Sequence, residues 1–220
     1  SDSRKWDGIS RMKTGKNTEK EEKIIENRKV RPGELFVVAG SIGQIGIRTL
    51  LAEKPDWFSP WFSASYLERI LQEEEPYLFD EEKPLKELVD RFGITGWRAV
   101  GEGGILKAVW DFSGEQGIGL TFGLRRIPVK QHVIELCEQC GANPYAIWCG
   151  RCLLLAVKEG WQLVQNLREQ GMEAEVIGAA EAGIARRICH GEDGTGYLER
   201  PREDELYRLL GRDGLKLADQ

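Results

Sequence analysis

Four of the five cysteines in this 220-residue chain form two Cys-x-x-Cys pairs, Cys137 with Cys140 and Cys149 with Cys152. Two such pairs can supply the four thiolates of a tetrahedral zinc site, so zinc is a candidate ligand. The elements expected around them favour another use. In the helix expected over residues 129–140, Cys137 and Cys140 fall on the apolar face, and Cys152 begins an entirely apolar strand.

Of these four cysteines, only Cys149 falls in an expected loop. We therefore favour reduced, buried thiols with no zinc bound by all four, and keep zinc, another thiophilic metal or a redox pair as alternatives. The other nucleophilic and basic candidates are weak. Cys189 reads as a strand residue beside His190, His132 lies on the polar side of its helix, and two isolated histidines do not form a catalytic set.

The composition describes a folded chain with an acidic body. Apolar residues make up 41%, with seven Trp, which is enough for the core of one domain. Residues 1–31 contain ten Lys and Arg against six Asp and Glu, which leaves 21 against 30 for the remainder. Such a body argues against nucleic acid as a partner, because phosphate binding needs a basic face. Without an apolar run of membrane-spanning length or a signal peptide, we expect a cytoplasmic protein with no membrane partner.

Strand and helix patterns alternate along the chain, which places the cysteines and glycines at the ends of elements. A hairpin expected to turn through residues 191–196 requires antiparallel pairing, so we expect an α+β domain rather than a purely parallel sheet. The expected organisation is a polar N-terminal arm over 1–30, the domain over 31–210 and a polar tail over 211–220. Strands are expected at 34–40, 95–101, 118–124, 152–157 and 172–180, and helices at 84–93 and 129–140 among others. We expect the core to include Trp110, Phe122, Leu154 and Ile177.

A glycine-rich stretch, Gly101-Glu102-Gly103-Gly104, lies between an expected strand and an expected helix. Free backbone N–H groups at a helix start can bind an anion. Glycines at such a junction also serve tight packing, and both interpretations stay open. The candidate anion-binding residues are these four together with Gly150.

The order of many segments resembles the C-terminal domain of one superfamily. The segments are EGGILKAVWDF, GLTFGLRRIPV, ELCEQCGANPYAI, CLLLAV, LREQGMEAEVIGAA and YLERPREDELYRLL. The superfamily includes aminoimidazole ribonucleotide (AIR) synthetase, selenophosphate synthetase, thiamine monophosphate kinase and the hydrogenase maturation dehydratase, and the chain looks most similar to the hydrogenase-maturation-like, AIR-synthase-related proteins. The resemblance runs from about Arg31 to Leu210. It implies a three-layer α/β/α unit with a mixed sheet.

The chain departs from the family pattern in two places. In the family this domain follows an N-terminal domain that carries the metal-binding acidic residues and most of the ATP site. Here the stretch MKTGK at 12–16, similar to the opening of such relatives, is followed fewer than twenty residues later by RPGELFVVAG. Many members also carry His-Asp-x-Thr before the paired glycines, where this chain has Arg98-Ala99-Val100-Gly101. Because Ala99 is neither acid nor base and Gly101 has no hydroxyl, the resemblance implies a degenerate active site.

These observations lead to three expected functions. The first is a stand-alone, non-catalytic binding, scaffold or regulatory protein related to hydrogenase maturation factors, which would need no cofactor and would not be an enzyme on its own. The second is half of a split ATP-dependent enzyme, which would use ATP and Mg²⁺ only with a separate ATP-binding chain. The third is a cysteine-rich metal-binding protein using Cys137, Cys140, Cys149 and Cys152. Expected partners are a second copy of the chain or a protein that supplies an ATP-binding domain.

Overall fold

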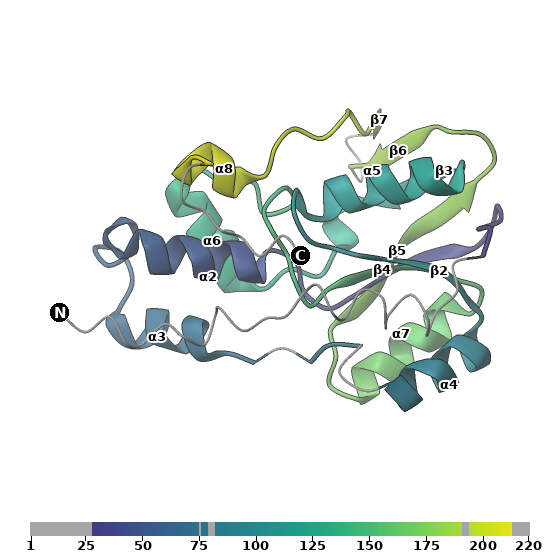
Figure 1. Ribbon diagram of the computed structural model, residues 1–220, viewed down its shortest axis with the longest axis horizontal. Coiled ribbons are helices and arrows are strands. Elements are labelled where there is room, and N and C mark those ends of the chain that lie inside the picture. The colour runs from purple at the N-terminus through teal and green to yellow at the C-terminus, as the bar shows by residue number, and fades with distance from the viewer. Residues whose placement is uncertain (1–27, 75, 79–81, 191–193, 213–220) are drawn as a thin grey trace.

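The structure is a computed structural model that describes residues 28–74, 76–78, 82–190 and 194–212. Within these residues the strands form one seven-stranded sheet in the order β2-β4-β1-β5-β3-β6-β7 (Figure 1). Neighbouring strands are antiparallel, except that β3 and β6 run parallel. The strands are β1 (Leu35–Ala39), β2 (Ile94–Ala99), β3 (Gly119–Gly123), β4 (Leu153–Val157), β5 (Ala174–Glu181), β6 (Arg186–Cys189) and β7 (Thr195–Tyr197).

The helices surround the sheet and also extend beyond one end of it (Figure 1). They are α2 (Gln44–Glu53), α3 (Ala64–Gln72), α4 (Glu82–Phe92), α5 (Gly104–Gln116), α6 (Gln131–Cys140), α7 (Gly160–Glu169) and α8 (Glu205–Leu210), with short 3₁₀ turns η2 (Pro55–Trp57) and η3 (Leu124–Arg126). No helix in the described part of the chain is long and apolar enough to cross a membrane.

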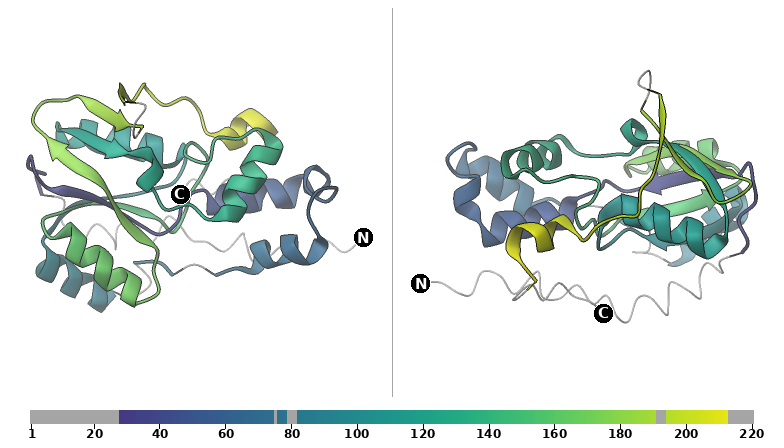
Figure 2. Two further views of the ribbon diagram at one scale, coloured as in Figure 1. Left: turned by 180° about the vertical axis from the view of Figure 1, so that it is seen from behind. Right: turned by 90° about the horizontal axis from the view of Figure 1, so that it is seen from above.

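The centre of the sheet is apolar on both faces because helices cover both. Every residue of β4 is buried, and its sequence, Leu-Leu-Leu-Ala-Val, is continuously apolar. Side chains alternate between the faces along each strand. Accordingly Val38 and Leu154, which are paired across β1 and β4, pack with α5, whereas Val37 and Leu155 pack on the opposite face with α4 and α7. The expected three-layer α/β/α arrangement with a mixed sheet is confirmed, and Figure 2 shows these layers from behind and from above.

A helical lobe, made of α2, α3, α6 and α8, lies at one end of the sheet (Figure 1). It has its own buried cluster, to which Leu50, Leu136 and Leu206 contribute from three of these helices. The side chain of Phe58, between η2 and α3, is fully buried in the same cluster. The lobe therefore holds the β1–α2 connection and the segment that precedes β4 in a fixed arrangement.

Some expected details differ from the structure. The domain limits of 31 and 210 stay a prediction, and Val30, one residue before them, is buried in the same cluster as Phe112 while its N–H donates to Gln116 at 3.1 Å. Trp110, expected to be buried, is only partly covered and packs under the guanidinium of Arg186, at 4.2 Å from the ring centroid. The other predicted core residues are buried, namely Phe122, Leu154 and Ile177.

Other predictions fall wholly or partly outside the described residues. Most of the predicted arm, 1–30, most of the predicted tail, 211–220, and half of the predicted hairpin turn, 191–196, lie there. The two strands of that hairpin, β6 and β7, are described and pair antiparallel at the edge of the sheet. Figure 2 shows them rising away from the other strands. The hairpin prediction is therefore confirmed for its strands.

Candidate functional site

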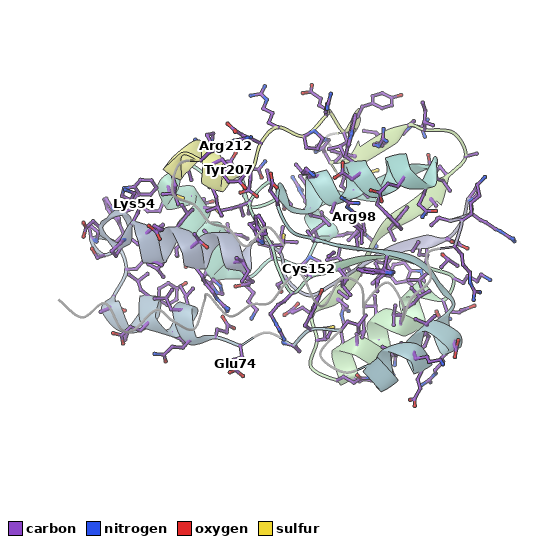
Figure 3. The ribbon with its side chains drawn as sticks, viewed as in Figure 1. Lys54, Glu74, Arg98, Cys152, Tyr207 and Arg212 are labelled. Atoms are coloured by element: carbon purple, nitrogen blue, oxygen red, sulfur yellow. The ribbon has the colours of Figure 1, made fainter. Side chains whose placement is uncertain are left out.

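The predicted glycine-rich site lies at the edge where β1 and β2 end and β4 begins. Leu153, the first residue of β4, pairs with both Ala39 and Ala99, the last residues of β1 and β2. The connections to α2 and α5 therefore leave the sheet on either side of the segment that leads into β4. Figure 3 shows Cys152, at the end of that segment, near the middle of the molecule where the sheet meets the helical lobe.

The two connections have similar local structure. Gly43 precedes α2 and Gly103 precedes α5, and both adopt left-handed conformations, with φ of 77° and 75°. Gly104 also has positive φ, 65°, and a Cβ atom at that position would lie 2.5 Å from the carbonyl oxygen of Tyr145. A side chain at residue 104 would therefore be strained in conformation and would collide with the backbone. This glycine serves close packing of the segment 145–150 against the start of α5.

The segment 145–150 closes the starts of both helices through its backbone. Its carbonyl oxygens accept the N–H groups of Ile45 and Gly46 in α2 and of Leu106 in α5, at 2.9 to 3.2 Å. Its own N–H groups donate to the β2–α5 connection, at Gly101 and Val100. The N–H groups of Ile45, Gly46 and Leu106, at the starts of α2 and α5, are thus hydrogen-bonded within the chain rather than left to bind an anion.

A buried carboxylate accepts the N–H of Gly103, the first of the paired glycines. Asp204 is fully buried, and its Oδ2 accepts the N–H of Gly103 at 2.6 Å while Oδ1 accepts that of Leu206 at 2.9 Å. The N–H of Trp148 also donates to this carboxylate. Burial raises the pKa of Asp204, and the hydrogen bonds from Leu206, Gly103 and Trp148 oppose that increase. The chain thus supplies its own anion at the start of α5.

The sequence contains a signal for part of this role of Asp204. An Asp immediately before the apolar pattern of α8 is typical of a helix N-cap, and Asp204 caps α8 through Leu206. Its second hydrogen bond reaches Gly103, 101 residues away, which no local pattern could indicate. Asp204 is therefore not among the site residues expected from the sequence.

The five predicted anion-binding residues are brought together, with different degrees of exposure. Gly101 and Glu102 are partly exposed, whereas Gly103 and Gly104 are buried. Gly150 has a φ of 66°, and a Cβ atom there would collide with Ile45. Anion binding by these residues stays a prediction. The N–H of Gly103 is already engaged by the chain's own carboxylate.

The residue types that differ from the family pattern also lie beside this edge. Arg98 forms ion pairs with Asp111 at 3.0 Å and with Glu115 at 2.6 Å, both on α5. Ala99 is exposed at the end of β2. The guanidinium of Arg98 is therefore committed to α5.

The four paired cysteines are divided between two hydrophobic clusters. Cys137 belongs to the helical lobe and Cys140 packs beside it, half-buried rather than fully buried as expected. Cys149 and Cys152 belong to the cluster between the sheet and α5. All five cysteines of the chain are free thiols. Among the described residues, no group of three or more His, Cys, Asp or Glu side chains could hold a metal ion.

Cys149 is the cysteine most closely associated with the glycine turns. It was expected in a loop and lies in one, but its side chain is fully buried. Its Sγ accepts the N–H of Gly43 at 3.3 Å and approaches the carbonyl oxygen of Ile147 at 3.7 Å. Burial raises the pKa of this thiol to about 12, so it is protonated at neutral pH. A protonated thiol is a poor nucleophile and a poor metal ligand.

The fold and this edge together define a class: three-layer α/β domains with a mixed sheet and glycine turns at the helix starts. Comparison with known families makes the class specific. Residues 31–188 match the model of the AIR synthase related protein, C-terminal domain, and the chain belongs to this family.

The relatives and solved structures agree with that assignment. The chain is 25% identical over 196 residues to a putative hydrogenase expression/formation protein of Methanocaldococcus jannaschii, covering 85% of this chain and 54% of that protein. A crystal structure of E. coli HypE matches with a TM-score of 0.66 at 20% identity, covering 84% of this chain and 55% of HypE. T. maritima PurL complexed with FGAR matches with a TM-score of 0.51 at 17% identity, covering 84% of this chain and 29% of PurL. The chain spans about half the length of the curated relative and of HypE.

Proposed function

We propose that this chain is a non-catalytic binding or scaffold protein related to hydrogenase maturation factors. The observation that carries the proposal is the carboxylate of Asp204 at the paired glycines, where it accepts the N–H of Gly103. A phosphate group that approached the same N–H would meet a buried carboxylate. Like charges in a buried site repel strongly, so the chain's own anion competes with any phosphate ligand there.

The neighbouring residues support the same proposal. Phosphoryl transfer depends on cations placed around the γ-phosphate, usually with Mg²⁺ held by carboxylates. Arg98, the nearest cation on β2, is paired with Asp111 and Glu115 on α5. Ala99 supplies no acid, base or metal ligand. The residues at this edge therefore serve packing between elements, and a surface that binds another protein is the better candidate for the functional site.

A phosphate-release assay tests this proposal directly. We expect the purified chain, given ATP and Mg²⁺, to release no phosphate above a protein-free blank. Turnover that persisted through purification would contradict the proposal, and its loss in a Gly104→Ala variant shown to be folded would place ATP chemistry at the paired glycines. Gly117→Ala is the matched control, since Gly117 also has positive φ, 61°, but lies at the far end of α5.

Half of a split ATP-dependent enzyme is the second candidate function. The observation that favours it is that one solved structure with this fold, at a TM-score of 0.63 and 17% identity, is that of HypE in complex with ATP. A separate chain that carries an ATP-binding domain would complete the cleft at residues 101–104. Mixing the chain with such a protein encoded nearby would then stimulate phosphate release, whereas the non-catalytic proposal expects no stimulation.

The proposal includes a protein partner and a cytoplasmic location. One solved structure with this fold, at a TM-score of 0.64 and 18% identity, is that of a HypE–HypF complex, so a protein of this fold binds another protein. For this chain we propose a homodimer as the simplest assembly. Its five free cysteines suit a reducing compartment such as the cytoplasm.

A further inference from the structure

A groove runs along the helical lobe between α3 and α6 and consists of two adjoining hollows. The hollows have volumes of about 620 and 520 Å³ and share Arg69 and His132. We call them together the α3–α6 groove and define it by Trp61, Phe62, Tyr66, Glu68 and Arg69 on the α3 side and Glu135 on α6. Burial lowers the pKa of His132, so this histidine is neutral at neutral pH.

Carboxylates outnumber cations along this groove. Glu68, Glu73 and Glu135 line it against Arg69. Lys130 neutralises Glu73 through an ion pair at 2.6 Å. Glu68 and Glu135 form no ion pair within the described part of the chain, so both keep their negative charge available to a ligand. The groove therefore favours a cationic ligand over an anionic one.

Trp61 presents an exposed aromatic ring in the same groove. Its side chain is 69% exposed, and its backbone N–H donates to the carbonyl oxygen of the buried Phe58 at 2.9 Å. The neighbouring Tyr66 ring already carries the guanidinium of Arg69, which lies 5.2 Å from the ring centroid. Among the described residues no cation lies over the Trp61 ring, so its face is open to an ammonium or guanidinium group.

The walls of the groove are fixed before any ligand binds. Phe62 and Tyr66 stack with their ring centroids 5.7 Å apart, and the Tyr66 hydroxyl donates to Glu135 at 2.6 Å, which joins α3 to α6. A Lys or Arg side chain can lay its apolar stem along such rings while its charged end meets a carboxylate. The ligand that this surface fits is thus a basic peptide segment.

The chain itself contains such a segment before its first described residue. Residues 4–16, RKWDGISRMKTGK, hold five Lys and Arg against one Asp, and we call them the basic segment. The rest of the chain has the opposite balance, because residues 32–220 hold 21 Lys and Arg against 30 Asp and Glu. The charge of the basic segment is therefore complementary to that of the α3–α6 groove.

The basic segment is joined to the domain by enough chain to reach the groove. Arg28 is held at β2, where its N–H donates to the carbonyl oxygen of Thr95 at 2.8 Å. Arg11 precedes Arg28 by 17 residues, which span up to about 55 Å when extended, against a diameter of roughly 40 Å for a compact domain of this size. A tether of this kind gives an effective concentration of about 1 mM, so that even a weak contact is populated.

We infer that the basic segment docks in the α3–α6 groove of its own chain, with a Lys or Arg side chain against the ring of Trp61 and its charge toward Glu68 or Glu135. The inference goes beyond the proposed function, because it makes the groove a surface that the chain covers itself. A partner protein that binds there must present a basic segment of its own and displace this one. The contact is thus autoinhibitory.

Nuclear magnetic resonance of the full chain tests the inference through the indole N–H signal of Trp61, which is assigned by its absence in Trp61→Ala. A neutralised variant carries Arg4→Gln, Lys5→Gln, Arg11→Gln, Lys13→Gln and Lys16→Gln. We expect the Trp61 signal to shift in this variant and to keep its wild-type position when Lys and Arg are exchanged at the same positions. Trp161 is the matched control, because it is 54% exposed on α7 with the Arg126 guanidinium over its ring, and its signal should stay in place.

Cross-linking with a carbodiimide, which joins a Lys amine to a carboxylate, identifies the contact directly. At about 1 µM protein, far below the effective concentration of the tether, we expect Lys5, Lys13 or Lys16 to be joined to Glu68 or Glu135 within the mass of one chain. Trp61→Ala should lower the yield about two- to fivefold, the effect of an exposed cation–π contact. Glu169→Gln, at an exposed position on α7, should leave it unchanged.

The outcomes decide the inference in either direction. A shift of the Trp61 signal that the Trp161 signal does not share, together with cross-links to Glu68 or Glu135, supports docking in the groove. A Trp61 signal that does not move in the neutralised variant overturns it. Cross-links spread evenly over the exposed carboxylates overturn it too, and so do cross-links found only at the mass of two chains, because the segment would then bind elsewhere or in another copy.

Discussion

Replacing Asp204 should show how much the buried carboxylate stabilises the junction between α5 and α8. Asp204→Ala removes the acceptor for Gly103 and the cap of α8 at Leu206 together. Loss of a helix cap costs about 1 kcal/mol, and a buried N–H left without an acceptor costs about 1 to 3 kcal/mol. Removing a buried charge returns part of that loss. We expect Asp204→Ala to lower the free energy of unfolding by roughly 2 to 3 kcal/mol.

Asp204→Asn is the informative partner variant, because the amide keeps the size of the side chain and one acceptor oxygen. Burial is the largest influence on the pKa of Asp204 and raises it, so the charged form gains less from folding than the neutral form. The amide NH2 cannot accept, so one of the N–H groups of Gly103 and Leu206 loses its acceptor, and we expect a loss of about 1 to 2 kcal/mol, smaller than that of Asp204→Ala. Glu203→Ala is the control, since Glu203 is exposed and pairs with Arg212 at 3.2 Å, and such pairs contribute about 0 to 1 kcal/mol.

The same carboxylate should produce a defined pH dependence. A pKa that is higher in the folded than in the unfolded chain means that the folded state binds the proton more tightly. The stability that this proton provides is complete below the unfolded pKa, about 4, and is lost as the pH rises through the raised value. The stability of the wild type relative to Asp204→Asn should therefore fall as the pH rises from about 4 towards 7.

Urea unfolding followed by circular dichroism measures these differences. An Asp204→Ala variant as stable as the wild type would show that the carboxylate does not hold the junction. Equal losses in Asp204→Ala and Asp204→Asn would show that charge, rather than the acceptor oxygen, matters. Relative stability that rose with pH would refute the sign of the pKa shift.

Two further predictions concern the same edge of the sheet. Gly104→Ala should lower the free energy of unfolding by roughly 2 to 4 kcal/mol, because its Cβ would meet the Tyr145 carbonyl. Gly117→Ala, with no neighbour near its Cβ, should lower it by about 1 kcal/mol. Equal losses in urea unfolding would contradict the packing argument. In thiol labelling of the native protein at neutral pH, the partly covered Cys189 should react well before Cys149. Cys149 should react only on the timescale of unfolding. Equal labelling rates by mass spectrometry would contradict the burial of Cys149.

The sequence predicted the strands and helices because their patterns are local, whereas the three layers were implied by the resemblance to the family. The continuous apolar run of β4 and the glycines that end α5 and α6, Gly117 and Gly141, both indicate their elements directly. Boundaries were less certain. The helix expected from residue 129 begins at Gln131, because Lys130 still has extended backbone. Hydrophobic periodicity alone does not fix the first turn of a helix.

The sequence indicated where the candidate site lies, but it did not predict which side chain fills it. The paired glycines marked the start of α5, yet the carboxylate that fills the turn comes from a segment a hundred residues later in the chain. His132 shows the same limit. Its helical phase placed it on the polar side, but α2 covers it, with Gln44 Oε1 3.0 Å from its Nε2, and burial lowers its pKa. Contacts between distant segments depend on how the helices pack, which a single sequence does not encode locally.

The cysteine pairs that first indicated a metal site can be explained by what their segment does. The segment 145–150 passes between two helix starts and satisfies most of their N–H groups through its backbone carbonyl oxygens, but the N–H of Gly43 is left for a side chain, which must accept it in apolar surroundings. The sulfur of Cys149 meets that need, because it accepts the N–H of Gly43 at 3.3 Å while remaining inside the hydrophobic cluster next to α5. A serine there would bury a hydroxyl that costs more to desolvate, and a larger apolar side chain would accept nothing. The spacing of a thiolate site and the packing of a helix junction can thus select the same residue types, and only the position of each sulfur distinguishes them.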